Sequence, residues 1–126
     1  MLIALIQSDI VWGDPKANLL KLDEMIAKTP HADVYLLPEM FSTGFVTSPE
    51  GKTEPAQGPV FQWMQNRAKY LGAVIAGSIA VEENGLFYNR MYFVRPDGSW
   101  EHYDKRHLFG AEADSYTPGK DRVIAQ

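Results

Sequence analysis

The order of buried-strand and helix patterns constrains the fold of this 126-residue chain more than any other feature of its sequence. Apolar runs of strand length occupy residues 2–7, 34–37 and 73–80, and two longer segments with helical spacing separate them. The runs 2–7 and 73–80 are apolar at both alternating sets of positions, as strands buried on two faces are. The sequence therefore predicts an α/β fold with parallel strands.

Capping residues mark the ends of the two predicted helices. Asp14 is a favourable N-cap residue and Pro15 suits the first helical position, so the first helix is expected to run to about residue 27. Gly58-Pro59 opens the second helix, and Gly72 ends it. One face of each helix is apolar. The apolar residues are Leu19, Leu22 and Ile26, and then Val60, Met64, Ala68 and Leu71. Both helices can therefore cover one face of a sheet.

Three further strands are expected after the second helix. They span residues 73–80, 86–95 and 100–103, and the tight turns Asn84-Gly85 and Pro96-Asp97-Gly98 separate them. Short turns of this kind join neighbouring antiparallel strands, which gives a meander. The whole pattern is a βαβαββ-type unit. Because no linker divides it, the chain is expected to form part of one domain over residues 1–126.

The composition argues against several classes of partner. The net charge is −4 and no basic run is present, so nucleic acid is not expected as the main partner. No stretch approaches the roughly 20 apolar residues of a membrane span, so we expect no membrane partner and a cytoplasmic location. No nucleotide-binding glycine motif is present, and the three histidines lack the spacing of a metal site. Neither a cofactor nor a metal is therefore expected.

Two charged residues follow predicted strands, where α/β proteins place their chemistry. Glu39 comes shortly after the second apolar run, and Lys105 comes after the last predicted strand. Open α/β sheets bind ligands outside the carboxyl ends of their strands. Structural alternatives stay open, since Glu39 could simply solvate a strand end and Lys105 could pair with Asp104 or Glu101.

Long motifs around these two residues resemble those of a known family. Residues 36–45, Leu-Leu-Pro-Glu-Met-Phe-Ser-Thr-Gly-Phe, resemble the glutamate motif of the nitrilase superfamily of carbon–nitrogen hydrolases. Residues 103–109, Tyr-Asp-Lys-Arg-His-Leu-Phe, resemble its lysine motif, and residues 116–119 resemble the segment that follows. With Tyr88-Asn89-Arg90, the motifs look most like the ω-amidase-like branch. The resemblance implies that this chain is the first, βαβαββ half of a nitrilase-type αββα sandwich.

The resemblance also implies a mechanism based on a Glu–Lys–Cys triad. In such enzymes a cysteine thiolate attacks the carbon of an amide or nitrile, and a glutamate moves the proton. A lysine ammonium stabilises the developing oxyanion. Glu39 matches the general base and acid, and Lys105 matches the oxyanion-stabilising residue. Glu112, seven residues after Lys105, is the best match to the supporting second glutamate of the family.

The chain departs from the family pattern because it contains no cysteine. In the family the nucleophile follows the lysine motif on a later strand, so this chain is expected to be truncated before it and inactive alone. No serine lies in a nucleophile-elbow Gly-x-Ser-x-Gly context that would activate its hydroxyl. The alternative is a non-catalytic binding or assembly module that keeps the half-fold without a nucleophile.

Expectations about substrate and assembly follow from the same resemblance. The substrate is expected to be a small amide such as a dicarboxylic acid monoamide, hydrolysed to ammonia through a Cys thioester. Arg90 or Arg106 could meet its carboxylate, and Phe41 and Phe45 could line the substrate pocket or simply pack. In the family the sheet of the second half covers the other sheet face. We therefore expect an exposed apolar face here and a homo-oligomer, most simply a dimer.

Overall fold

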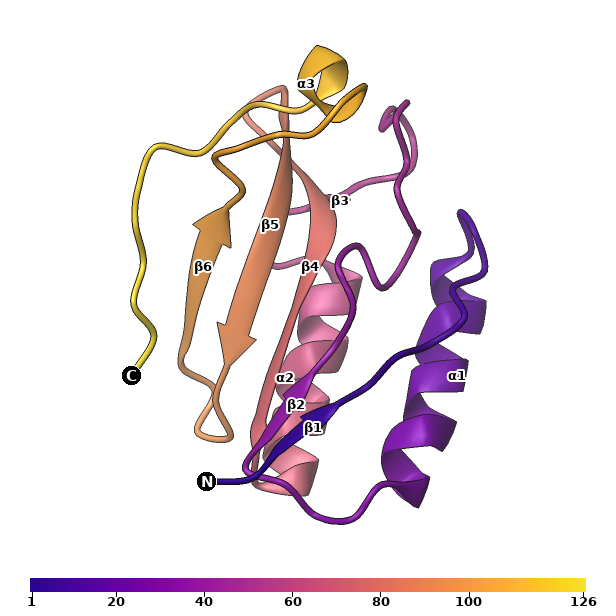
Figure 1. Cartoon of the computed structure of the whole chain (residues 1–126), viewed down its shortest axis with the longest axis vertical. Helices are drawn as coiled ribbons and strands as arrows, with labels where there is room; N and C mark the ends of the chain where they lie inside the picture. Colours follow the sequence, from indigo (N-terminus) through magenta and orange to yellow (C-terminus); the bar gives the residue numbers. More distant parts are fainter.

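The computed structural model describes residues 1–126 and contains one mixed sheet with helices packed against it (Figure 1). None of the helices combines the length and the apolar character that a membrane span requires. In chain order the elements are β1 (Ile3–Leu5), α1 (Pro15–Lys28), β2 (Val34–Leu36), β3 (Glu54–Pro55), α2 (Pro59–Leu71), β4 (Val74–Glu83), β5 (Leu86–Val94), β6 (Trp100–Asp104) and α3 (Glu112–Ser115).

The sheet has the strand order β1-β2-β4-β5-β6. The pairs β1–β2 and β2–β4 are parallel, and β4, β5 and β6 form the expected antiparallel meander. Asn84 and Gly85 join β4 to β5 with φ values of 53° and 76°, the left-handed conformations that a tight type I′ hairpin turn requires. The predicted α/β class is confirmed. The sequence did not reveal the two-residue β3, which pairs with β4, or the short α3.

Local chemistry explains where the two long helices begin and end. The carboxylate of Asp14 accepts a hydrogen bond from the Ala17 N–H at 3.0 Å and so caps α1. The N-cap of α2 is Gly58, which has no side chain to offer. The carboxylate of Glu54 accepts from the first free N–H groups of α2 instead. Gly72 ends α2 at a φ of 61°, as the sequence predicts.

The main core lies between the helices and one face of the sheet. Leu22 and Ile26 of α1 and the stripe of α2 pack there against inward-facing strand residues. Those strand residues are Tyr35, Ile75, Ile79, Val81, Tyr92 and Val94. Residues that face the same way alternate along each strand, so the intervening residues form the opposite face. The two helices therefore cover only one side of the sheet (Figure 1).

The opposite face of the sheet is apolar and only partly covered. Its exposed side chains include Ile3 at 47%, Leu5 at 74% and Met91 at 36% of their full accessibility. The extended C-terminal segment lies over part of this face, where Val123 and Ala125 line a hollow with Met91. The expectation of an apolar second face without a layer of helices is therefore met. We call this surface the open face.

Candidate active site

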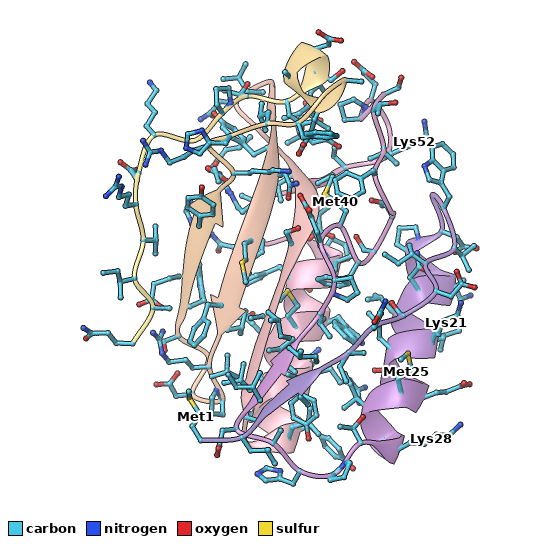
Figure 2. The ribbon with its side chains drawn as sticks, viewed as in Figure 1. Met1, Lys21, Met25, Lys28, Met40 and Lys52 are labelled. Carbon is cyan, nitrogen blue, oxygen red and sulfur yellow. The ribbon has the colours of Figure 1, made fainter.

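The loop that carries Glu39 begins where β2 ends and is fastened to β4. The Ser78 hydroxyl accepts a hydrogen bond from the Met40 N–H at 2.9 Å, and the Ser78 carbonyl accepts from the Phe41 N–H at 3.2 Å. Met40 has a φ of 54°, which is uncommon outside glycine, and its fully buried side chain lies beside β4 (Figure 2). The sharp change of direction at Met40 leaves Glu39 at the edge of the open face.

A small second core packs against the loop that carries Glu39. Met40, Val46, Ala80 and Tyr116 form a separate buried apolar cluster. The Tyr116 hydroxyl donates to the Val46 carbonyl at 2.8 Å. The residue before it, Ser115, donates from its hydroxyl to the Thr47 carbonyl at 2.8 Å. The α3 segment is therefore tied to the loop that follows Glu39, although about 70 residues separate them in sequence.

The structure brings Lys105, Glu39 and Glu112 into direct contact. Lys105 is the first residue after β6, and its backbone N–H donates to the Asn89 carbonyl at 2.9 Å. Its ammonium donates to Glu39 Oε1 at 2.8 Å and to Glu112 Oε2 at 3.0 Å. The alternative partners Asp104 and Glu101 make their ion pairs with arginines instead. The three charged residues singled out from the sequence therefore form one cluster.

Asn89 belongs to this cluster, and reasoning from the sequence did not give it a role. Its amide Nδ2 donates to Glu39 Oε1 at 2.8 Å and to Glu112 Oε1 at 2.9 Å, and the residue is only 2% exposed. The available signal was a polar pair, Asn89-Arg90, within the aromatic strand β5. A buried polar group in a strand needs hydrogen-bond partners, and here the partners are the two carboxylates.

Burial and hydrogen bonding shift the pKa values of two of these groups. Burial favours the neutral form of Glu112, but hydrogen bonds from Asn89, Lys105 and the Phe109 N–H outweigh it and hold the pKa of Glu112 below its usual range. Burial also favours neutral Lys105, but hydrogen bonds to Glu39 and Glu112 outweigh it and raise the pKa of Lys105. Both residues are therefore charged near neutral pH.

The lowered pKa of Glu112 gives a prediction about acid stability. Its carboxylate stabilises the fold above the usual glutamate pKa, and this contribution is lost as the pH falls through the lower pKa of the folded state. In urea titrations, the unfolding free energy of the wild type should fall as the pH is lowered from about 5 to about 3. We expect this fall to be about 1 kcal/mol smaller in Glu112→Gln. The control is Asp114→Asn, an exposed acidic neighbour on α3. Equal acid sensitivity in wild type and Glu112→Gln would contradict the assignment.

The charged cluster borders a hollow on the open face. The hollow has a volume of about 280 Å³, and Glu39, Ser78, Asn89 and Lys105 line it together with apolar residues. The apolar residues are Leu36, Leu37, Met91 and Tyr103, and Gly77 completes the lining. No group of three or more His, Asp or Glu side chains has an arrangement that could hold a metal ion. At such an apolar hollow, a carboxylate can transfer a proton to or from a bound molecule, and an ammonium can stabilise an anion that develops on it.

The two loop aromatics lie in different environments. Phe41 is fully buried in the main core, where its ring centre lies 6.0 Å from that of Trp63, so its environment is that of a packing residue. Phe45 is 52% exposed, and the Lys105 ammonium lies 5.9 Å from its ring centre. Phe45 also lines a second hollow of about 360 Å³ beside Glu112. Only Phe45 therefore lies where it could meet a molecule bound at the cluster.

Comparison with known proteins identifies the family to which this fold belongs. Residues 2–125 match the model of the carbon–nitrogen hydrolase family. The ω-amidase YafV of Escherichia coli K12 is 39% identical over 98% of this chain and 49% of its own length. The 2-oxoglutaramate amidase of Bacillus subtilis is 37% identical over 85% of this chain and 43% of its own length. The chain thus spans about half the length of these curated relatives.

A solved structure shows the same relationship. A carbon–nitrogen hydrolase superfamily protein from Xanthomonas campestris, with an arsenic adduct in its active site, superposes with a TM-score of 0.93. It is 34% identical, and the match covers 98% of this chain and 48% of that one. Fold and site thus define an α/β protein with a lysine held between two glutamates at the carboxyl ends of its strands. The chain belongs to the carbon–nitrogen hydrolase family, which confirms the resemblance stated from its motifs.

Proposed function

We propose that this chain supplies the glutamate and lysine of an amide hydrolase whose cysteine nucleophile lies outside these 126 residues. The observation that carries the proposal is the Lys105 ammonium, held between the carboxylates of Glu39 and Glu112 at the edge of a hollow. The chain has no cysteine of its own, so we expect it to be inactive when it is assayed alone. Family membership and the ω-amidase relatives support the reaction class.

Each charged residue has a physically reasonable part in the reaction. The side chain of Glu39 is 42% exposed, so its carboxylate can reach a thiol and take its proton. The thiolate then attacks the amide carbon, and Glu39 gives the proton to the departing nitrogen as the C–N bond breaks. Ammonia leaves and a thioester remains, which water hydrolyses in a second half-reaction with Glu39 again acting as base.

Lys105 and Glu112 are proposed to serve the oxyanion. An ammonium has three N–H donors, and two of those of Lys105 are used by the carboxylates. The third remains for the oxygen of the tetrahedral intermediate. Glu112 is 5% exposed and has a lowered pKa, which suits a residue that stays charged and holds Lys105 in place. Proton transfer is therefore assigned to Glu39.

The proposed substrate is a small dicarboxylic acid monoamide. The names of two relatives, an ω-amidase and a 2-oxoglutaramate amidase, support this class. Of the two arginines considered for the substrate carboxylate, Arg90 is 4% exposed and already bonded to Asp104 and Glu83. Arg106 is half-buried, makes no ion pair, and directly follows Lys105. We therefore propose Arg106 for this role, together with Phe45 at the rim.

Ammonia release by a chimera tests the proposed function. The chain is joined after Gln126 to the part of the Escherichia coli ω-amidase that follows the 49% matched by this chain. By the family pattern, we expect that part to carry the cysteine. With succinamate as substrate, we expect the chimera to release ammonia and the 126-residue chain alone to release none. A folded chimera that releases no ammonia would favour a binding or assembly module instead. Release by the isolated chain would contradict the need for an external cysteine.

The open face gives a prediction about assembly. An exposed apolar surface that carries Ile3, Leu5 and Met91 favours association. We expect the isolated chain to form a homo-oligomer, most simply a dimer, with a mass of at least twice its own 14.2 kDa in light scattering. The variant Leu5→Lys should shift it toward the monomer, whereas Leu20→Lys on the exposed side of α1 should not. A monodisperse wild-type monomer would contradict this expectation.

A further inference from the structure

An ion pair between a buried arginine and a partly buried aspartate lies directly behind Lys105, on the face of the sheet opposite the hollow. Arg90 of β5 and Asp104 of β6 are register partners, and Lys105 is the next residue along the chain. Because side chains alternate along a strand, Arg90 points to the side covered by the helices, whereas its neighbour Asn89 points to the carboxylates. Arg90 therefore contacts none of the charged groups at the hollow.

The pair is bidentate and strongly oriented. Arg90 Nε lies 2.7 Å from Asp104 Oδ1, and Nη2 lies 3.0 Å from Oδ2. The same Nη2 donates to Glu83 Oε2 at 2.7 Å, and the guanidinium lies 5.3 Å from the ring centre of Tyr88. Two parallel hydrogen bonds fix the angle between guanidinium and carboxylate as well as their distance. The pair therefore holds the last residue of β6 in one orientation.

The backbone around Lys105 is held on two more sides. Its N–H donates to the Asn89 carbonyl at 2.9 Å, and its carbonyl accepts from the Gly119 N–H at 3.0 Å. The segment that contains Gly119 returns toward the end of β6, and we call it the returning segment. It approaches Asp104 so closely that a Cβ atom on Gly119 would lie 2.8 Å from the Asp104 Cβ and would also clash with the Asp104 carbonyl. Only glycine permits this contact.

We propose that Arg90, Asp104 and Gly119 form a clamp that positions Lys105, with Arg90 acting through Asp104. A lysine side chain is long and flexible, so its ammonium reaches two carboxylates together only if its backbone is fixed. The clamp fixes the residue before Lys105 by its side chain and Lys105 itself by both peptide groups. Its catalytic importance rests on the proposed function, but its effect on the contacts of Lys105 does not.

The rate at which Lys105 is acetylated measures these contacts without any turnover. Acetic anhydride reacts with the free amine, and peptide mass spectrometry reads each lysine separately. The variant Arg90→Lys keeps the charge but loses the two parallel hydrogen bonds. We expect Lys105 to be acetylated roughly two- to fivefold faster in this variant, the factor expected for weakening a partly exposed ion pair. Lysines elsewhere in the chain should keep their rates.

Arg95→Lys is the matched control. Arg95 also pairs with a carboxylate of β6, Glu101, and its guanidinium lies 5.2 Å from the ring centre of Phe93, but it sits at the far end of the β5–β6 ladder. A merely structural role predicts that both arginine variants change Lys105 acetylation equally. The clamp requires faster acetylation in Arg90→Lys alone, so equal rates in the two variants would overturn it.

A second variant covers the case in which Arg90→Lys does not fold. Gly119→Ala should also accelerate acetylation of Lys105, because the added methyl group pushes the returning segment away from Asp104. Lys120→Ala, at the next position of the same segment, should not. A folded Gly119→Ala variant with the wild-type rate would overturn the clamp. Since the readout needs no catalysis, the clamp and the proposed function can fail independently.

Discussion

Replacement of Glu39 by glutamine is expected to lower kcat of the cysteine-bearing chimera by about 10²–10⁴-fold, the usual contribution of a general base. Glutamine keeps the size of the side chain, and its amide oxygen can still accept hydrogen bonds from Asn89 and Lys105. It cannot take a proton from the thiol. The loss should therefore appear in kcat, with circular dichroism unchanged, when ammonia release is measured at saturating substrate.

Glu82→Gln is the control for this variant. Glu82 is an exposed glutamate on β4 and lies outside the lining of the hollow. Its replacement makes the same chemical change and should leave kcat within about twofold of wild type, as for other surface substitutions. If Glu39→Gln retained a kcat similar to that of Glu82→Gln, Glu39 would be a residue that only accepts hydrogen bonds from its neighbours.

The second large effect is expected for Lys105→Gln. Removal of a donor that stabilises an oxyanion typically costs about 10²–10³-fold in kcat. Here the loss includes a positioning effect, because Glu39 and Glu112 would face each other without the ammonium that separates their charges. The measurement is again ammonia release at saturating substrate, accompanied by a thermal melt.

One surface lysine variant shows whether the effect belongs to this position. Lys120→Gln removes an exposed ammonium from the same C-terminal region and should keep both kcat and the thermal midpoint. The Lys105→Gln variant should fold, since Asn89 still bridges the two carboxylates. A folded Lys105→Gln chimera with substantial residual turnover would count against the oxyanion role.

Most of the fold was predictable because its signals are local. The N-cap at Asp14, the left-handed Gly72 and the Asn84-Gly85 turn each determine a helix or strand boundary within a few residues. The strand β1 is shorter than the predicted 2–7, and β3 was not predicted at all. Both depend on pairing with distant strands, which local pattern does not report. The uncovered face was expected because two strands are apolar on both faces, the two helices can cover only one face, and the family covers the other with its second sheet.

The site was predictable only in part, for a similar reason. Glu39 and Lys105 stand at strand ends inside motifs, so their importance could be argued from the sequence. Glu112 was assigned by its motif position, and its contact with Lys105 depends on the turn at residues 109–112. Asn89 was missed because its partners lie 50 and 23 residues away. The burial of Phe41 was undecided, since only the packed core distinguishes it from Phe45.

Covalent trapping of the acyl enzyme tests most directly the proposal that Glu39 and Lys105 of this chain assist a cysteine outside it in cleaving an amide. The chimera is mixed with succinamate and quenched in acid within the first turnover. The mass of the intact protein is then measured by mass spectrometry. We expect a thioester adduct on the cysteine of the wild-type chimera, with one ammonia released for each adduct, and no adduct in Glu39→Gln or Lys105→Gln over the same time. Equal adduct formation in all three proteins would contradict the assignment of these residues.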